Sequence, residues 1–280
     1  MIDSRKNIEK RFVSAGTPVY YSLRGLSHDQ KILASAIYSF YGEIENIFFV
    51  CQDPQLAQIK FNWWRVEVTK MSEGHADHPL MNFLSQFIIQ YPFLQEKLLE
   101  IIDGVEQNFV CSSFSRFEDV VVHFMKTAGL RELLVMRILH PDNSVDKESI
   151  YRLMVGIELV NYLQYFRRYA QKDFILFPMD ELYKFNVKAR DFQSFKTTSE
   201  MEKLFLHQVS KVKKCFDGLS ELQKSDRVKL SHLIIRSKIA ESTLDEIQKS
   251  HFKILEQLIT LTPLRQWWIS LKSLTLENTF

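Results

Sequence analysis

The sequence predicts an all-α protein, built as one bundle of long helices. Apolar residues recur at helical spacing through most of the 280 residues, and alternation of the β type is absent over any useful length. The chain has only 8 Gly and 7 Pro, which argues against long loops and Pro-rich linkers. Residues typical of helix ends separate the periodic segments, so each segment is expected to be a distinct helix.

We expect the first long helix over residues 28–50, with Ser27 as its N-terminal cap. A second helix should begin at Asp53-Pro54, because a cap residue followed by proline is a typical helix start, and it should end near Gly74. The first helix places its apolar residues at i, i+3 and i+4, which predicts one buried face: Ile32, Leu33, Ala36, Ile37 and Phe40.

The remaining elements follow the same periodicity. A loop over residues 75–79 precedes an expected helix over 80–90. Clear breaks stand at residues 141–143 and near Pro178. No internal repeat is visible, so a single domain over residues 1–280 is expected. The other expected helices cover residues 93–109, 116–139, 146–170, 199–218, 226–239 and 243–260.

Composition and charge restrict the classes of function. A hydrophobic content of 46% is ordinary for a globular protein, and a net charge of +2 argues against a broad nucleic-acid surface. Cys51, Cys111 and Cys215 stand far apart, which indicates neither a zinc site nor a disulfide framework and favours a reducing compartment. The N-terminus lacks the apolar region of a secretory signal, and no apolar run approaches the ~20 residues that span a bilayer. We therefore expect a cytoplasmic protein, or a mitochondrial matrix protein if the source is eukaryotic, with peripheral membrane contact left open.

Several stretches occur in an order and spacing that resemble the squalene/phytoene synthase family over residues 15–190. They are "YYSLRGLSHDQKILASAIYSFYGEIENIFF", "WWRVEV", "HPL", "IIDGVEQNF", "TAG" and "NYLQYFRRYAQKDFILFPMDEL". The resemblance implies the isoprenoid synthase fold, with helices around a central prenyl-binding cavity. It also implies two Asp-rich helices that hold Mg²⁺ ions, which neutralise a diphosphate leaving group.

The first metal-binding motif of the family is not preserved. The Asp-Asp-x-x-Asp pattern falls on "ENIFF", so Glu45 keeps a carboxylate, Asn46 is an amide and Phe49 is a ring. An arginine that precedes this motif in the family falls on Gly42. The aspartate of the family's Gly-Met-x-x-Asp helix falls on Asn108.

The second motif also departs from the family pattern. Asn161 and Leu163 match the family's asparagine and leucine, but Gln164 takes the arginine position. Tyr165 and Tyr169 take the positions of two aspartates. We expect their rings to fill the core in preference to binding a new ligand, because a tyrosine ring fills volume and its hydroxyl needs only one partner.

These departures predict a pocket that no longer holds metal and diphosphate. Several carboxylates are needed for a Mg²⁺ cluster, and Glu45 is the only surviving candidate ligand; a hydrogen-bonded or solvated helix carboxylate is the favoured interpretation of it. No catalytic residue, metal or cofactor is therefore expected. Tyr21 and Ser22 are candidate retained pocket residues. After the "TAG" turn, Arg131-Glu132 stands where the family tends to have Val-Gly.

A second resemblance is to a degenerate subgroup of this family that acts in the assembly of mitochondrial respiratory complex I. It is carried by "FPMD" at residues 177–180 and by "LRQWWISLKS" near the C-terminus. The main hypothesis is a catalytically inactive family member that works through a protein partner, in respiratory complex assembly or at a membrane surface. One alternative is an active head-to-head prenyl transferase with an altered diphosphate site, which would require Mg²⁺. Another is a protein that binds an isoprenoid or quinone lipid.

Two further patterns have a functional and a structural interpretation. The loop "HADHP" at residues 75–79 offers histidines at metal-like spacing, but a helix-connecting turn is favoured. Trp267 and Trp268 could dock at a membrane interface, where Trp is enriched, but packing of a terminal helix is favoured. Trp63 and Trp64 lie on an amphipathic segment, and core packing is expected for at least one of them.

Overall fold

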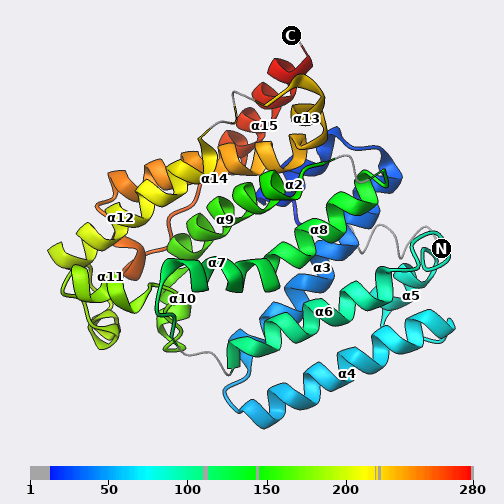
Figure 1. Cartoon of the computed structure of the whole chain (residues 1–280), viewed down its shortest axis with the longest axis horizontal. Coiled ribbons are helices and arrows are strands. Elements are labelled where there is room, and N and C mark those ends of the chain that lie inside the picture. The colour runs from blue at the N-terminus through cyan, green and yellow to red at the C-terminus, as the bar shows by residue number, and fades with distance from the viewer. Residues whose placement is uncertain (1–12, 110–112, 143–144, 218, 220–221, 279–280) are drawn as a thin grey trace. The chain divides into compact units, whose positions relative to one another are not determined.

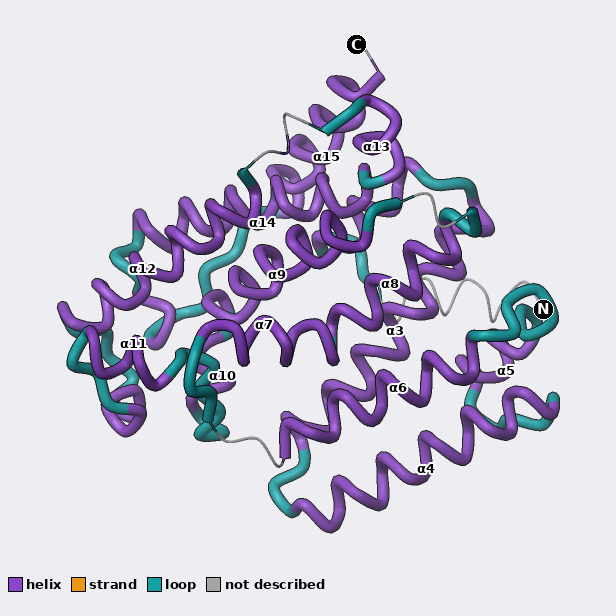
Figure 2. The backbone as a smooth tube through the Cα atoms, in the orientation of Figure 1, coloured by secondary structure: helices purple, strands orange, loops and turns teal. Residues whose placement is uncertain are grey.

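The computed structural model describes residues 13–109, 113–142, 145–217, 219 and 222–278. Within these ranges the secondary structure is helical and no strand occurs, which confirms the all-α prediction (Figure 2). The chain divides into two compact units. Unit 1 comprises Met1–Val110 and Lys126–Ser144, and unit 2 comprises Cys111–Met125 and Val145–Phe280. A single domain over residues 1–280 stays a prediction.

Unit 1 is organised around one long helix. In it, α3 packs against α4, α6 and α8, and α4 packs against α5 and α6 (Figure 1). Its elements are α2 (Pro18–Ser22), η1 (Leu23–Gly25), α3 (His28–Val50), α4 (Pro54–Glu73), α5 (Pro79–Ser85), α6 (Leu94–Glu106), η2 (Gln107–Phe109) and α8 (Ala128–Leu139).

Local sequence signals fix the ends of the helices in unit 1. The Ser27 side chain and the Gln30 side chain cap α3 reciprocally, and Asp53 accepts a hydrogen bond of 2.8 Å from the backbone of Gln55 at the start of α4. Gly74 ends α4 with φ +80°, a conformation that favours glycine. His78 caps α5, its Nδ1 accepting from the backbone N–H of Leu80 at 3.3 Å. The predictions of Ser27, Asp53 and Gly74 as helix ends are confirmed.

Unit 2 is organised around α9, which packs against both α12 and α14, while α14 also packs against α15 (Figure 1). Its elements are α7 (Phe117–Lys126, whose last residue belongs to unit 1), α9 (Lys147–Gln164), α10 (Phe166–Ala170), α11 (Met179–Lys184), η3 (Ala189–Ser194), α12 (Ser199–Phe216), α13 (Lys224–Lys229), α14 (Ser231–Lys249), η5 (Lys253–Leu255) and α15 (Pro263–Asn278).

Two expected helices are each broken in the structure. The prediction of one helix over 116–139 is wrong, because Thr127 has non-helical dihedral angles (φ −114°, ψ −95°) between α7 and α8. The prediction of one helix over 146–170 is wrong as well, since the chain leaves α9 at Tyr165 (φ −102°, ψ 16°) before α10 begins. Neither Thr127 nor Tyr165 is a strong helix breaker, so periodicity alone could not locate these breaks.

Two other expected boundaries are also wrong. Residues 226–239 and 243–260 were expected to be separate helices, but α14 runs without interruption through residues 240–242. Ala240 and Thr243 are buried there, so packing of this face continues across the expected break. The helix expected over 80–90 ends at Ser85, and turns follow it.

Membrane-spanning length and cysteine burial can be stated for the described residues. None of the helices in those residues is both long enough and apolar enough to cross a bilayer. Cys51 is buried and Cys215 is half-buried. Cys111, the N-terminal residues 1–12 and residue 218, at the end of the expected helix 199–218, lie outside the described residues.

Candidate functional site

The predicted site residues fall into two groups, one in each unit, and each group is described by itself. That the two groups line one pocket stays a prediction. The group in unit 1 contains Tyr21, Ser22, Gly42, Glu45, Asn46, Phe49 and Asn108. The group in unit 2 contains Asn161, Gln164, Tyr165 and Tyr169.

The first motif lies on α3 and holds a single carboxylate. Glu45 accepts a hydrogen bond of 3.4 Å from the Tyr41 hydroxyl one turn earlier. Asn46 is exposed, and Phe49 is half-buried with its ring centre 5.3 Å from that of Phe48. Gly42 is also exposed, and a Cβ atom added there would meet nothing within 4 Å. Steric packing therefore does not require glycine at position 42, where the resemblance implies an arginine.

Two other predicted residues of unit 1 are buried by local packing. Tyr21 is 7% exposed, and its ring makes an edge-on contact with that of Tyr20, with centres 5.3 Å apart. The Ser22 hydroxyl donates to the Val19 carbonyl at 2.8 Å, within the same short helix α2. Both residues are thus held by neighbours in the chain.

Asn108 follows α6, in the short element η2. Its buried Oδ1 has no hydrogen-bond partner among the described residues. Gly104, one turn earlier, is in close contact with the chain before α8. A Cβ atom on Gly104 would lie 1.9 Å from the carbonyl oxygen of Lys126, a distance that no side chain tolerates. Glycine is therefore required where α6 meets the Lys126–Thr127 segment.

A buried charge cluster in unit 1 was not predicted from the sequence. Glu132 is fully buried and accepts hydrogen bonds from Tyr38 Oη at 2.7 Å and from Arg131 Nη2 and Nε at 2.6 and 3.1 Å. The Arg131 guanidinium lies over the Tyr41 ring, 4.3 Å from its centre. We call Tyr38, Tyr41, Arg131 and Glu132 the buried charge cluster.

The buried charge cluster contains an ion pair, Arg131–Glu132, where the resemblance implies small apolar residues. Burial of two charges is expensive unless both are paired and hydrogen-bonded, a condition that Arg131 and Glu132 meet here. The pair is neutral as a whole, so it adds no net charge to α8. The sequence signal was the presence of adjacent charges in "AGLRELLVMRIL", an otherwise apolar helix.

The second motif lies at the C-terminal end of α9 and contains no carboxylate. Tyr165 is 43% exposed because the chain turns there between α9 and α10, so the expectation that its ring fills the core is wrong. Partial burial raises the pKa of Tyr165 above its usual value. Tyr169 is half-buried, with its ring centre 5.0 Å from that of Tyr162 and 6.1 Å from that of Phe174.

The two polar residues of the second motif bond to neighbouring protein groups. Gln164 Nε2 donates to the backbone carbonyl of Ile259 at 2.8 Å. Asn161 Nδ2 donates to Glu158 Oε2 at 3.3 Å, one turn earlier in α9. Gln164, where the resemblance implies an arginine, therefore anchors α9 to the chain after η5.

The rings that fill the core of unit 2 around α10 come mainly from residues other than Tyr165 and Tyr169. Phe166 lies at the centre, with its ring 4.8 Å from Phe192 and 5.0 Å from Phe177. Tyr162 is 2% exposed, and its hydroxyl accepts a 2.9 Å hydrogen bond from the backbone N–H of Leu176. Tyr169 lies at the edge of this aromatic cluster, which has its own dense packing.

A second polar cluster that the sequence did not predict joins α11 to α12. The buried Glu181 carboxylate accepts a hydrogen bond of 2.6 Å from Gln208 Nε2 and pairs with the ammonium of Lys211. Lys211 Nζ also lies 3.8 Å from the centre of the Phe117 ring. Burial lowers the pKa of Lys211 below its usual value, although the carboxylate of Glu181 opposes this shift. Glu181 and Lys211 therefore fix the segment that begins at "FPMD".

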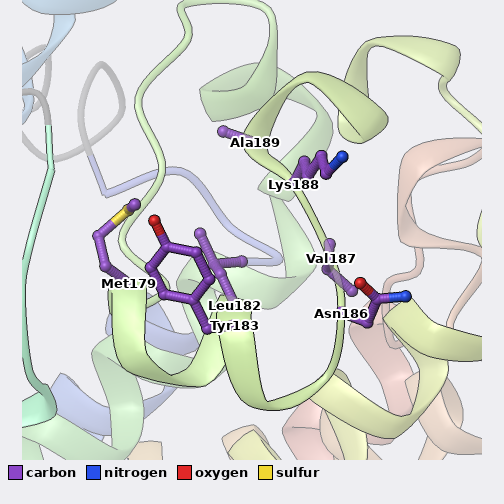
Figure 3. A pocket seen from close by; sticks show the side chains of 7 residues that line it. All are labelled: Met179, Leu182, Tyr183, Asn186, Val187, Lys188 and Ala189. Carbon is purple, nitrogen blue, oxygen red and sulfur yellow. The ribbon is translucent and has the colours of Figure 1, made fainter.

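A small surface pocket lies on the outer side of α11. Its volume is about 180 Å³, and it is lined by Met179, Leu182, Tyr183 and residues 186–189 (Figure 3). Leu182 and Val187 form its buried floor, whereas Tyr183 is 78% exposed. The lining is mostly apolar and contains no carboxylate.

The described side chains offer too few clustered ligands for a Mg²⁺ cluster. Within the described ranges, no group of three or more His, Cys, Asp or Glu side chains is placed to hold a metal ion. In the "HADHP" loop, His78 caps α5 and its ring lies 4.7 Å from that of Trp64, centre to centre. This loop therefore serves as a turn between α4 and α5.

The chain is similar in sequence to known proteins of one family. A model of the squalene/phytoene synthase family matches residues 13–268. A phytoene synthase from Arthrospira platensis is 21% identical over 211 residues, covering 69% of this chain and 67% of that relative. The chloroplastic phytoene synthase 1 of Solanum lycopersicum is 23% identical over 200 residues, and the matched region spans only 48% of its length.

Solved structures show the same fold. A crystal structure of a dehydrosqualene synthase in complex with ligand has a TM-score of 0.78 and 13% identity, covering 100% of this chain and 98% of that one. A squalene synthase, HpnC from Alicyclobacillus acidocaldarius, has a TM-score of 0.68 and 14% identity, covering 90% and 94%. These structures confirm the predicted isoprenoid synthase fold.

Proposed function

Because the chain belongs to the squalene/phytoene synthase family, we propose that it is a member that has lost catalysis and works by binding another protein. The observation that carries this proposal is the side-chain content of the two metal-binding motifs. Aspartate positions of the family hold Phe49, Tyr165 and Tyr169. Glu45 is the one carboxylate left in either motif, and it bonds to Tyr41.

The chemistry of the family explains why this loss would stop the reaction. Mg²⁺ prefers several oxygen ligands, and in this family the metal neutralises the diphosphate as it leaves. Electrostatic stabilisation of developing charge is usually the largest catalytic contribution, so its removal should leave little turnover. Gln164, at the family's arginine position, supplies no charge to a diphosphate.

A direct test is incubation of the purified chain with Mg²⁺ and farnesyl or geranylgeranyl diphosphate. We expect neither a condensed isoprenoid product nor released diphosphate above the level without protein. Turnover that Glu45→Gln abolishes would overturn the proposal. Glu73→Gln, the same change at the exposed end of α4, is a matched control for handling and folding. Turnover of this kind would support the second candidate, a prenyl transferase with an altered site, which the phytoene synthase relatives favour.

The finer assignment, to assembly of respiratory complex I, is supported by the resemblance of the "FPMD" and "LRQWWISLKS" stretches. The exposed apolar pocket beside Tyr183 supports only the broader proposal of a protein partner, because an apolar side chain of such a partner fits a pocket of this kind. The test is complementation in cells of the source organism from which this chain has been deleted. Wild type and Glu45→Gln should restore assembled complex I equally, and failure of Glu45→Gln alone would point to catalysis instead.

An isoprenoid- or quinone-binding role stays the third candidate. It predicts saturable binding of a diphosphate-free isoprenoid alcohol or a quinone to the purified chain. A saturable change in tryptophan fluorescence as the lipid is added would measure this binding.

A further inference from the structure

The outer face of α4 carries a stripe of exposed apolar side chains that no packing within unit 1 covers. Leu56, Ile59, Trp63 and Val66 are 46%, 65%, 47% and 51% exposed. Their spacing of three, four and three residues places them within about 80° of the helix circumference and along about 15 Å of its length. We call these four residues the α4 stripe.

The opposite face of α4 packs against the rest of unit 1, which fixes the direction in which the α4 stripe points. Phe61, Trp64 and Val68 are buried, and α4 contacts α3, α5 and α6 (Figure 1). The Trp63 ring is held edge-on against Trp64, with centres 5.1 Å apart. The stripe therefore lies on a helix whose opposite face is buried in the core of unit 1.

The charges around the α4 stripe favour a surface that is neutral or anionic. Lys60 flanks the stripe on one side, whereas uncharged Gln55 and Asn62 flank the other. Between Asp53 and Glu73 the only acid in the sequence is Glu67, and it is buried. Lys70, one turn beyond Val66, pairs with Asp77 at 2.6 Å. The exposed face of α4 therefore presents no carboxylate along the stripe.

We propose that the α4 stripe docks this protein onto a lipid bilayer surface, with the helix lying in the interface. A helix of this kind buries Trp and aliphatic side chains just below the headgroups, where Trp is enriched, while Lys60 reaches the phosphates. The proposal depends on α4 alone and stands whether or not the chain catalyses a reaction.

A second copy of the chain is a less suitable occupant of the α4 stripe. A two-fold antiparallel pairing centred on the stripe would have its axis near residue 61. Both copies of Lys60 would then lie on the same flank of the pair, close to one another, and like charges oppose such a contact. A membrane instead places an anionic or zwitterionic headgroup beside Lys60.

Flotation of the full chain with vesicles tests the proposal. We expect it to float with phosphatidylcholine vesicles, and more strongly when phosphatidylglycerol is included. Ile59→Glu should weaken partitioning at least roughly tenfold, because it removes an apolar contact and adds a carboxylate. Gln58→Glu, which makes the same charge change about 120° from the stripe, should float like wild type. Circular dichroism of each variant checks the fold.

Other results would overturn the proposal. One is the absence of flotation with either vesicle, and another is equal loss in Gln58→Glu and Ile59→Glu. A third is loss in Trp268→Glu, on the exposed side of α15, with Ile59→Glu unaffected, which would assign the lipid contact to α15. A dimer in solution that Ile59→Glu dissociates, in a chain that does not float, would show that a second copy covers the stripe.

Discussion

The buried charge cluster allows a sharp test of how unit 1 is held together. In Glu132→Leu the carboxylate is lost from a site with no solvent exposure, while Arg131 stays 5% exposed and loses the acceptor of both its hydrogen bonds to Glu132. Breaking a buried ion pair from one side typically costs about 3–5 kcal/mol. We expect a loss of this size in the free energy of unfolding.

The double variant Arg131→Met/Glu132→Leu separates the pair from its individual charges. When both charges are removed and the volume is kept, no charge is left uncompensated, so the cost should fall to about 1–2 kcal/mol. Tyr38→Phe removes one hydrogen bond to the carboxylate without changing a charge, and it should cost about 1.5–3 kcal/mol.

Urea unfolding followed by fluorescence provides the measurement, in a Trp267→Phe/Trp268→Phe background that leaves only Trp63 and Trp64, both in unit 1. This background matters because two units can unfold separately, and a single transition would then mix them. If the costs of Arg131→Met and Glu132→Leu add to within about 0.5 kcal/mol in the double variant, the two charges are not coupled and the reasoning is refuted.

Three further predictions follow from close packing and burial. Gly104→Ala should lower the free energy of unfolding by roughly 3 kcal/mol, because its Cβ would overlap the Lys126 carbonyl. Gly42→Ala, in open space on α3, is the control and should be neutral or stabilising by up to about 1 kcal/mol. Equal losses of stability in the two variants, measured by urea unfolding, would contradict this. Burial away from water lowers the pKa of His123 from 6.5 to about 4. The neutral ring therefore contributes roughly 3 kcal/mol that is present above pH 6.5 and lost as the pH falls towards 4, and His123→Phe should flatten this part of the stability–pH curve. Burial raises the pKa of Cys215 to about 11. In a Cys111→Ser background, a thiol reagent should therefore label the native chain slowly at neutral pH and quickly in urea. Rapid labelling of the native chain would show an accessible thiolate and contradict this prediction.

The parts of the fold that short-range sequence signals determine were predicted well. Ser27, Asp53 and Gly74 mark the ends of α3 and α4 through hydrogen bonds or dihedral angles that belong to single residues. The breaks at Thr127 and Tyr165 were missed, because neither residue type ends a helix on its own. At Thr127 the neighbouring carbonyl lies against Gly104, a contact between residues distant in the sequence.

The candidate site shows the same division between local and distant information. The match of Glu45, Phe49 and Tyr169 to the family's aspartate positions rests on spacing alone and stays a prediction. The side-chain partners in the buried clusters could not be predicted from spacing. The Glu132 carboxylate accepts a hydrogen bond from Tyr38, 94 residues earlier, and no sequence pattern within α3 or α8 predicts this contact. The exposure of Tyr165 likewise depends on a turn in the backbone that its side chain does not reveal.

The turn at Tyr165 bears on what aspartates at positions 165 and 169 could do. They would restore the pattern that the resemblance implies, but α9 ends at Gln164 and α10 begins at Phe166, so the two positions do not belong to one continuous helix. Two codon changes would therefore supply carboxylates without the one-turn spacing on a continuous helix that aims such a pair at a common ion. In this chain the backbone at Tyr165, and not the side chains alone, limits what such substitutions would achieve.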